Sequence, residues 1–156
     1  MLTNSSEQAM QTLEITRQIE IAAPIAIVFQ CILEQLGPRN EDPDRTPTPM
    51  RLEAWPGGRW FRDLGNNTGD FWGVVQSIRP PDRLEIHGPM FMSSPVISHV
   101  SYALSEQAGR TRIRFAHRVA GQLPVEYQDG GDINQGWTNY FVRLGELVAR
   151  TTGESR

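Results

Sequence analysis

The sequence predicts an α+β fold in which a curved antiparallel sheet wraps around a long C-terminal helix, with one or two short helices after the first strand. The middle of the chain consists of short segments in which apolar and polar residues alternate, separated by turns rich in Gly, Pro and Asn. This pattern is typical of an antiparallel meander. Residues 133–151 then carry apolar side chains three and four positions apart, as in an amphipathic helix that needs a sheet to cover its apolar face.

The remaining elements follow from the same two periodicities. Residues 14–21 alternate and form the first expected strand. A helix is expected over 25–36, with Pro24 near its first turn and Gly37 at its end. The later strands are expected, in order, at 50–55, 59–64, 69–78, 83–87, 96–104 and 110–119.

The last of these strands has two contrasting faces. One face carries arginines at four positions, and the other carries Thr111, Ile113, Phe115, His117 and Val119. An imidazole on a buried face needs a hydrogen-bond partner in the core or must face a cavity. His117 therefore indicates either an ordinary core contact or a polar group in a pocket.

The terminal helix presents a continuous apolar face. Asp132 is expected to cap its first turn. The residues on the apolar face are Ile133, Trp137, Tyr140, Phe141, Leu144, Leu147 and Val148.

Length and composition limit the classes of protein to consider. A chain of 156 residues accommodates one domain, expected at 14–151 after a flexible N-terminal tail at 1–13. The formal charge of −3, with no dominant basic patch, argues against a nucleic-acid partner. No apolar run is long enough for a membrane span, and the N-terminus lacks the features of a secretion signal.

The cysteine and histidine content predicts neither disulfides nor metal. Cys31 is the only cysteine, so an intrachain disulfide is excluded, which fits a reducing, cytoplasmic location. The three histidines show no short ligand spacing, so no metal and no cofactor is expected.

Residues 38–50 form a polar stretch with four prolines and are expected to be a surface loop. A loop of this length within a compact domain is either a lid over a site or a plain connector. Both interpretations stay open at this level.

Between about residues 14 and 149 the chain resembles the helix-grip superfamily of START-like (SRPBCC) proteins. Within it, the chain is most similar to bacterial single-domain proteins related to the C-terminal domain of the heat-shock-protein ATPase activator. The order and spacing of the matching segments carry the resemblance. These segments are Ile19-Glu20-Ile21-Ala22-Ala23-Pro24 running into Val28-Phe29, Trp55-Pro56-Gly57-Gly58-Arg59, Gly73-Val74-Val75 through Pro80-Pro81-Asp82-Arg83-Leu84, Val100-Ser101-Tyr102-Ala103-Leu104, Gly109-Arg110-Thr111-Arg112-Ile113 through His117, and Gly136-Trp137 ahead of Leu144 and Leu147.

The resemblance implies a helix-grip fold with a cavity between the sheet and the last helix, which in relatives takes apolar or amphipathic molecules. No catalytic set runs through the superfamily, so no catalytic residue is assigned. The candidate ligand-binding residues, each of which also fits plain core packing, are His117, Tyr102, Trp137, Tyr140, Phe115 and Trp72.

Three functions are consistent with these observations. The first is binding of a small hydrophobic or amphipathic ligand in the cavity. The second is an enzyme of the polyketide cyclase, aromatase or hydrolase kind, in which His117 is the first choice for an acid or base. The third is a protein-interaction module like the ATPase activator, which predicts a filled interior and an exposed apolar patch. A homodimer is compatible with all three.

Overall fold

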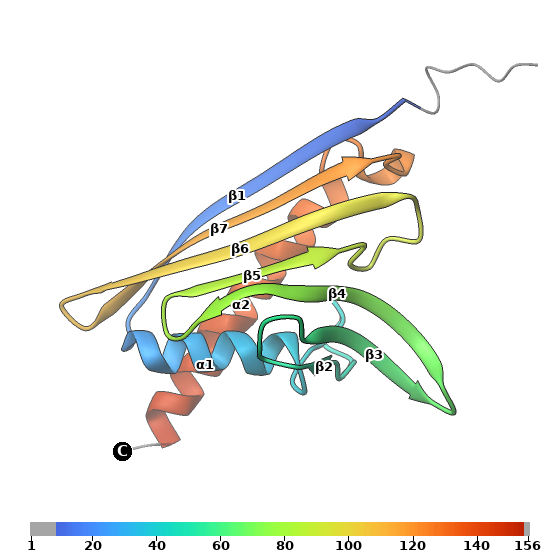
Figure 1. Cartoon of the computed structure of the whole chain (residues 1–156). Coiled ribbons are helices and arrows are strands. Elements are labelled where there is room, and N and C mark those ends of the chain that lie inside the picture. Colours follow the sequence, from blue (N-terminus) through green and yellow to red (C-terminus); the bar gives the residue numbers. More distant parts are fainter. Residues whose placement is uncertain (1–8, 155–156) are drawn as a thin grey trace, which may run out of the picture.

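The computed structural model describes residues 9–154 and shows one seven-stranded antiparallel sheet that curves around a long helix (Figure 1). The strand order is β1-β7-β6-β5-β4-β3-β2. This confirms the predicted α+β helix-grip architecture. The elements are β1 (Gln11–Ile21), α1 (Ile25–Leu36), β2 (Arg51–Leu52), β3 (Arg59–Gly65), β4 (Thr68–Arg79), β5 (Arg83–Gly88), β6 (Val96–Gln107), β7 (Arg110–Gly121), η1 (Val125–Tyr127) and α2 (Gly131–Glu154).

Several boundaries differ from the sequence-based expectation. β1 begins at Gln11, so the last part of the expected tail is a strand, while residues 1–8 lie outside the described residues. The expected strand at 50–55 shortens to β2, because the chain turns after it: the N–H of Gly58 donates to the carbonyl of Trp55 at 2.8 Å.

The two faces of β7 are separated as the alternation predicts. Its inward residues are buried, and Thr111 and His117 are fully excluded from solvent. On the outer face, Arg112 pairs with Glu20 at 2.8 Å and Arg118 pairs with Glu14 at 2.7 Å, both across to β1. The arginines are therefore a solvated surface of a central strand.

α2 crosses the concave face of the sheet and buries its apolar face there (Figure 1). Leu144 is fully buried at the centre of this contact. The helix begins earlier than expected, and Asp129 accepts a hydrogen bond from the N–H of Gly131 at 3.0 Å. Asp129 therefore serves the helix start, a role that the sequence suggested for Asp132.

α1 lies beside α2 and is joined to it and to β3 by buried side chains. Gln35 donates to the carbonyl of Tyr140 at 2.9 Å, and the indole of Trp60 donates to the carbonyl of Leu36 at 2.7 Å. Cys31 is buried on the same helix. These contacts fix the end of α1 at the place where the loop 38–50 begins.

Within residues 9–154, no helix is both long enough and apolar enough to cross a bilayer.

Candidate functional site

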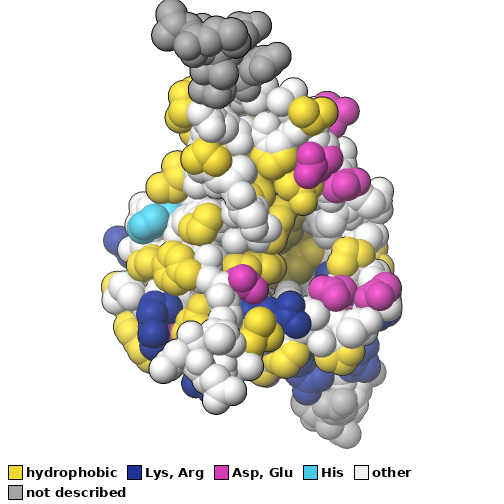
Figure 2. All heavy atoms as spheres, turned by 90° about the vertical axis from the view of Figure 1, so that its right-hand side faces the viewer, with side chains coloured by type: hydrophobic (Ala, Val, Ile, Leu, Met, Phe, Trp, Pro, Cys, Tyr) yellow, Lys and Arg dark blue, Asp and Glu magenta, His cyan; other side chains and the backbone are white. Residues whose placement is uncertain are grey.

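A cavity of about 370 Å³ opens between α2, the strands β3 and β4, and the loop 38–50. Figure 2 shows a hollow with an apolar floor on this side of the molecule, with charged side chains around it. Aromatic side chains dominate the lining. They are Trp60, Trp72, Phe91, Tyr127, Trp137 and Tyr140.

The sheet supplies one wall of the cavity. Trp60 on β3 and Trp72 on β4 meet edge to face, with ring centroids 5.0 Å apart. Gly88 at the end of β5 has φ of +154°, and a Cβ there would lie 2.4 Å from the carbonyl oxygen of Trp72. Only glycine allows this close approach. It brings the next residues alongside Trp72, where the N–H of Met90 donates to the Trp72 carbonyl at 2.9 Å and Phe91 packs against the indole.

The helix supplies the opposite wall. Its cavity-facing residues recur at helical spacing along about three turns. They are Asp132, Ile133, Gly136, Trp137, Tyr140 and Arg143. The acidic end of this face and its basic end are thus about 16 Å apart at about 1.5 Å of rise per residue.

His117 lies behind this wall. Its Nδ1 accepts a hydrogen bond from the indole N–H of Trp137 at 3.0 Å. A nitrogen that accepts cannot carry the proton, so the proton of the neutral ring is on Nε2. Nε2 is buried and has no hydrogen-bond partner among the described residues. Burial lowers the pKa of His117 from 6.5 to about 4, which keeps the imidazole neutral at pH 7.

A second buried polar contact joins the sheet to α2. The hydroxyl of Tyr102 donates to that of Tyr140 at 3.3 Å, and burial raises the pKa of both phenols above their usual value of 10. Phe115 on β7 packs against both Tyr102 and the helix, with its ring 5.1 Å from Tyr102 and 4.4 Å from Trp137. This cluster holds the cavity-lining aromatics in place.

The structure divides the six predicted ligand-binding residues into two layers. Trp72, Trp137 and Tyr140 line the cavity. His117, Tyr102 and Phe115 do not line it, but each contacts a residue of α2 that does. The sequence alternation places these three on the inward face of the sheet and does not show that α2 covers them.

Further lining residues were not among the sequence candidates. Arg143 falls three positions after Tyr140, so the helical spacing could have identified it. Phe91 lies in an irregular segment and Tyr127 in the short helix η1, and no sequence signal points to either residue.

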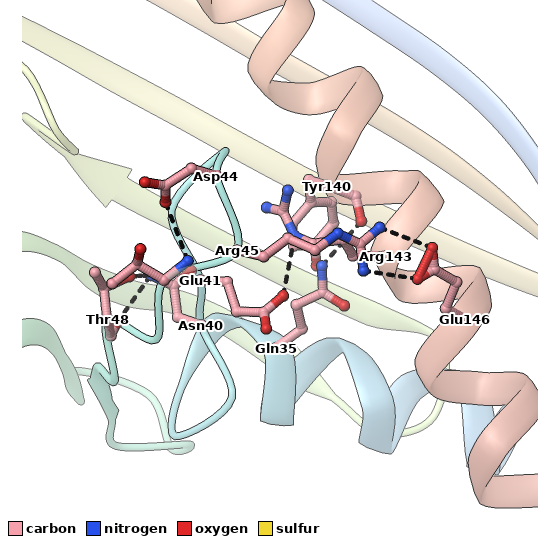
Figure 3. A network of polar contacts seen from close by, with 10 residues as sticks. Gln35, Asn40, Glu41, Asp44, Arg45, Thr48, Tyr140, Arg143 and Glu146 are labelled. Atoms are coloured by element: carbon pink, nitrogen blue, oxygen red, sulfur yellow. Dashed lines mark hydrogen bonds and ion pairs between the residues drawn. The ribbon is translucent and has the colours of Figure 1, made fainter.

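The loop 38–50 forms the outer rim of the cavity and is fixed to α2 by two ion pairs (Figure 3). Arg45 of the loop makes two hydrogen bonds of 2.8 and 2.9 Å with Glu146 of the helix. Arg143 of the helix lies 3.6 Å from Glu41 of the loop. The loop and the helix thus each contribute one cation and one anion to these pairs. Beneath these pairs, a second cleft of about 240 Å³ shares Arg143 and Glu41 with the aromatic cavity.

Among the residues that the structure describes, no three His, Cys, Asp or Glu side chains come together in a way that could hold a metal ion. Arg62 and Asp42 also line the cavity. The chemistry of the site is therefore aromatic stacking and apolar contact, combined with a few charges at its ends and rim.

Solved structures share this fold at low sequence identity. An uncharacterised protein from Rhizobium leguminosarum matches with a TM-score of 0.65 and 21% identity over 91% of this chain and 99% of that one. CalU16 from Micromonospora echinospora matches with a TM-score of 0.61 and 19% identity over 94% and 88%. DynU16, a protein in the dynemicin biosynthetic locus, matches with a TM-score of 0.60 and 18% identity over 87% and 47%.

The sequence comparisons identify the family. No curated protein matches the chain significantly. The model of the family described as "Activator of Hsp90 ATPase homolog 1-like protein" matches residues 22–149, which is most of the chain. The match confirms the resemblance stated from the sequence. The chain belongs to the family of Activator of Hsp90 ATPase homolog 1-like proteins, within the START-like helix-grip group.

Proposed function

We propose that this protein binds a small apolar or amphipathic molecule in the cavity between the sheet and α2. The observation that supports this most strongly is a hollow of about 370 Å³ onto which six aromatic side chains open. Small-molecule sites are typically concave, mostly apolar and about 300–1,000 Å³ in volume, with a few polar groups that orient the ligand. The cavity has each of these properties.

The packing behind the wall also supports a preformed site. Trp137 is held by the imidazole of His117, and Tyr140 is held by Tyr102 and, through its carbonyl, by Gln35. Side chains fixed in this way lose little conformational entropy when a ligand arrives. The cavity is thus lined by rigid aromatic surfaces on α2.

Binding is favoured over the two other functions. His117, the first choice for an acid or base, lies behind Phe91 and Trp137 and does not line the cavity. A general acid or base must lie within hydrogen-bond reach of its substrate, so His117 does not fill that role for a molecule in this cavity. A protein-interaction module predicts a filled interior, whereas this interior is hollow. The similarity to DynU16, from a biosynthetic locus, agrees with a small-molecule ligand.

A fluorescence titration with 1-aminoanthracene tests the proposal. The wild-type protein is expected to bind the probe and to enhance its emission. Trp72→Ala removes one wall of the cavity and should raise the dissociation constant about tenfold, because it removes a large apolar contact surface.

Trp55→Ala is the matched control, because Trp55 is 57% exposed and does not line the cavity. Its dissociation constant should stay within about twofold of wild type. Absence of probe binding by the wild-type protein, or equal effects of the two substitutions, would contradict the proposal.

A further inference from the structure

Arg143 is a largely buried charge of the cavity. Its side chain is only 11% exposed, and it lines both the aromatic cavity and the neighbouring cleft. Figure 3 shows it reaching from α2 toward the loop, beside Arg45. Its nearest carboxylate belongs to Glu41, at 3.6 Å from Nε. Its guanidinium makes no hydrogen bond within residues 9–154.

This arrangement leaves a buried cation with unused donors. A guanidinium is always charged and presents five N–H groups in a planar fork. Burying such a group without hydrogen bonds is unfavourable, and an ion pair at 3.6 Å does not supply them. A carboxylate that approaches the fork in its plane would accept two parallel, charge-assisted hydrogen bonds.

The other charges of the cavity are placed differently. Arg45, which lines only the neighbouring cleft, is already engaged, because both of its terminal nitrogens donate to Glu146. Arg62 lies on β3, where its side chain is partly exposed and solvated. Asp132 lies at the opposite end of the α2 face, about three turns away, where it would repel an anion. Asp42 also lines the cavity, but it is exposed on the loop, where water screens its charge. The cavity therefore offers its least satisfied cation to an acidic group at the Arg143 end.

We infer that Arg143 recognises a carboxylate on the ligand, and that the ligand class is an aromatic or polycyclic carboxylic acid. The ring system packs against Trp72 and Trp137, and the acid group pairs with the Arg143 guanidinium. This inference rests on the proposed function, since it names the chemistry of the molecule that the same cavity binds.

Glu41 competes with the ligand for Arg143 in this arrangement. Its side chain is 34% exposed and lies on the loop, so it can turn into water when a ligand carboxylate takes its place. The exchange replaces the 3.6 Å ion pair between Arg143 and Glu41 with a pair of hydrogen bonds between Arg143 and the ligand carboxylate. Removing the Glu41 charge should therefore strengthen binding of an acid.

Two probes with the same ring system separate the contribution of the carboxylate to binding from that of the aromatic rings. They are 1-pyrenebutyrate, which is ionised at pH 7.4, and 1-pyrenebutanol, which is neutral. Wild-type protein should bind the acid about tenfold more tightly than the alcohol, as expected for a charge-assisted bidentate contact. Arg143→Gln should abolish that preference by weakening the acid alone, and should leave the alcohol within about twofold.

Two further variants complete the test. Arg62→Gln, the matched loss of a rim cation, should weaken acid binding by less than about threefold, because a solvated charge contributes little. Glu41→Gln should bind the acid at least as tightly as wild type. If Arg143→Gln does not fold, as judged by circular dichroism, Glu41→Gln decides: weaker acid binding in that variant overturns the inference.

The outcomes distinguish the two proposals. Equal affinity of wild type for acid and alcohol overturns the role of Arg143 and leaves the proposed function standing. An acid preference that survives Arg143→Gln overturns it as well. Failure of wild type to bind either probe contradicts the proposed function, and the inference with it.

Discussion

The imidazole of His117 connects the sheet to α2 through one hydrogen bond. Nδ1 accepts from Trp137 at 3.0 Å, while Nε2 is buried without a partner among the described residues. A neutral ring is required, because a protonated Nδ1 could not accept the indole N–H. The orientation of a cavity-lining tryptophan therefore depends on the protonation state of a residue behind it.

The pH dependence of stability follows from this residue. Burial lowers the pKa of His117 to about 4 from 6.5. Between these values the unfolded chain binds a proton that the folded protein does not, so the free energy of unfolding falls as the pH is lowered. The loss should be about 2 kcal/mol between pH 7 and pH 5. Urea unfolding at both pH values measures it.

His117→Asn provides the control for the pH dependence. Its side-chain oxygen can still accept from Trp137 but does not titrate, so this variant should lose clearly less stability than wild type over the same interval. The carboxylates with lowered pKa, such as those of Glu20 and Glu53, titrate at lower pH and affect both proteins alike. An identical loss in wild type and variant would contradict the assignment.

At the scale of the element, α2 has three distinct faces. One packs into the sheet around Leu144, which is fully buried, and another is solvated, with Val142 56% exposed. A third face, ending at Arg143, lines the cavity. The helix therefore holds the fold together and provides one wall of the site at the same time.

Alanine substitutions at Leu144 and Val142 should distinguish the buried face of α2 from its exposed face by their effects on stability. Leu144→Ala should lower the free energy of unfolding by about 2–5 kcal/mol, because it removes a buried side chain and leaves a cavity. Val142→Ala, on the exposed face of the same helix, should change it by less than about 0.5 kcal/mol. Thermal or urea unfolding compares them, and similar losses for both would contradict the placement of α2 on the sheet.

The loop 38–50 is the second functional element, because it closes the rim of the cavity. Its internal hydrogen bonds include Thr48 N–H to the Asn40 carbonyl at 2.9 Å, and Arg45 ties it to Glu146. Both charged partners are partly exposed, so the pair should contribute little to the stability of the fold. Its effect should instead be local.

Arg45→Gln should therefore speed amide hydrogen exchange in residues 40–48 without a comparable change in the sheet. Hydrogen exchange followed by mass spectrometry measures this. Arg39→Gln is the control, because its pair with Glu34 joins the end of α1 to the next turn of chain and not to α2. Unchanged exchange in the loop of Arg45→Gln would show that the ion pair does not hold it.

At the scale of the whole molecule, the sequence predicts the architecture well because each element has a clear period. Alternation in β7 correctly places His117 and Phe115 on the inward face, and the helical spacing of α2 brings Trp137 and Tyr140 to the sheet. The family resemblance adds the expected order of the elements, and the family match confirms that resemblance.

The site is less predictable than the fold, because it depends on contacts between distant segments. Periodicity shows that His117 faces inward, but only the structure shows that Trp137 covers it. Phe91 enters the cavity from an irregular segment that Gly88 brings close to Trp72. Arg143 lies within the predicted helix, yet its burial depends on the loop 38–50, whose path has no sequence period.

The central claim, an occupied cavity between the sheet and α2, is tested most directly by the four tryptophan indole N–H signals in a ¹H–¹⁵N spectrum recorded during titration with 1-pyrenebutyrate. Ring currents from a pyrene in the cavity should shift the signals of Trp60, Trp72 and Trp137, which line it, and leave Trp55 unmoved. A spectrum in which no indole signal moves, or in which only Trp55 responds, would contradict the account.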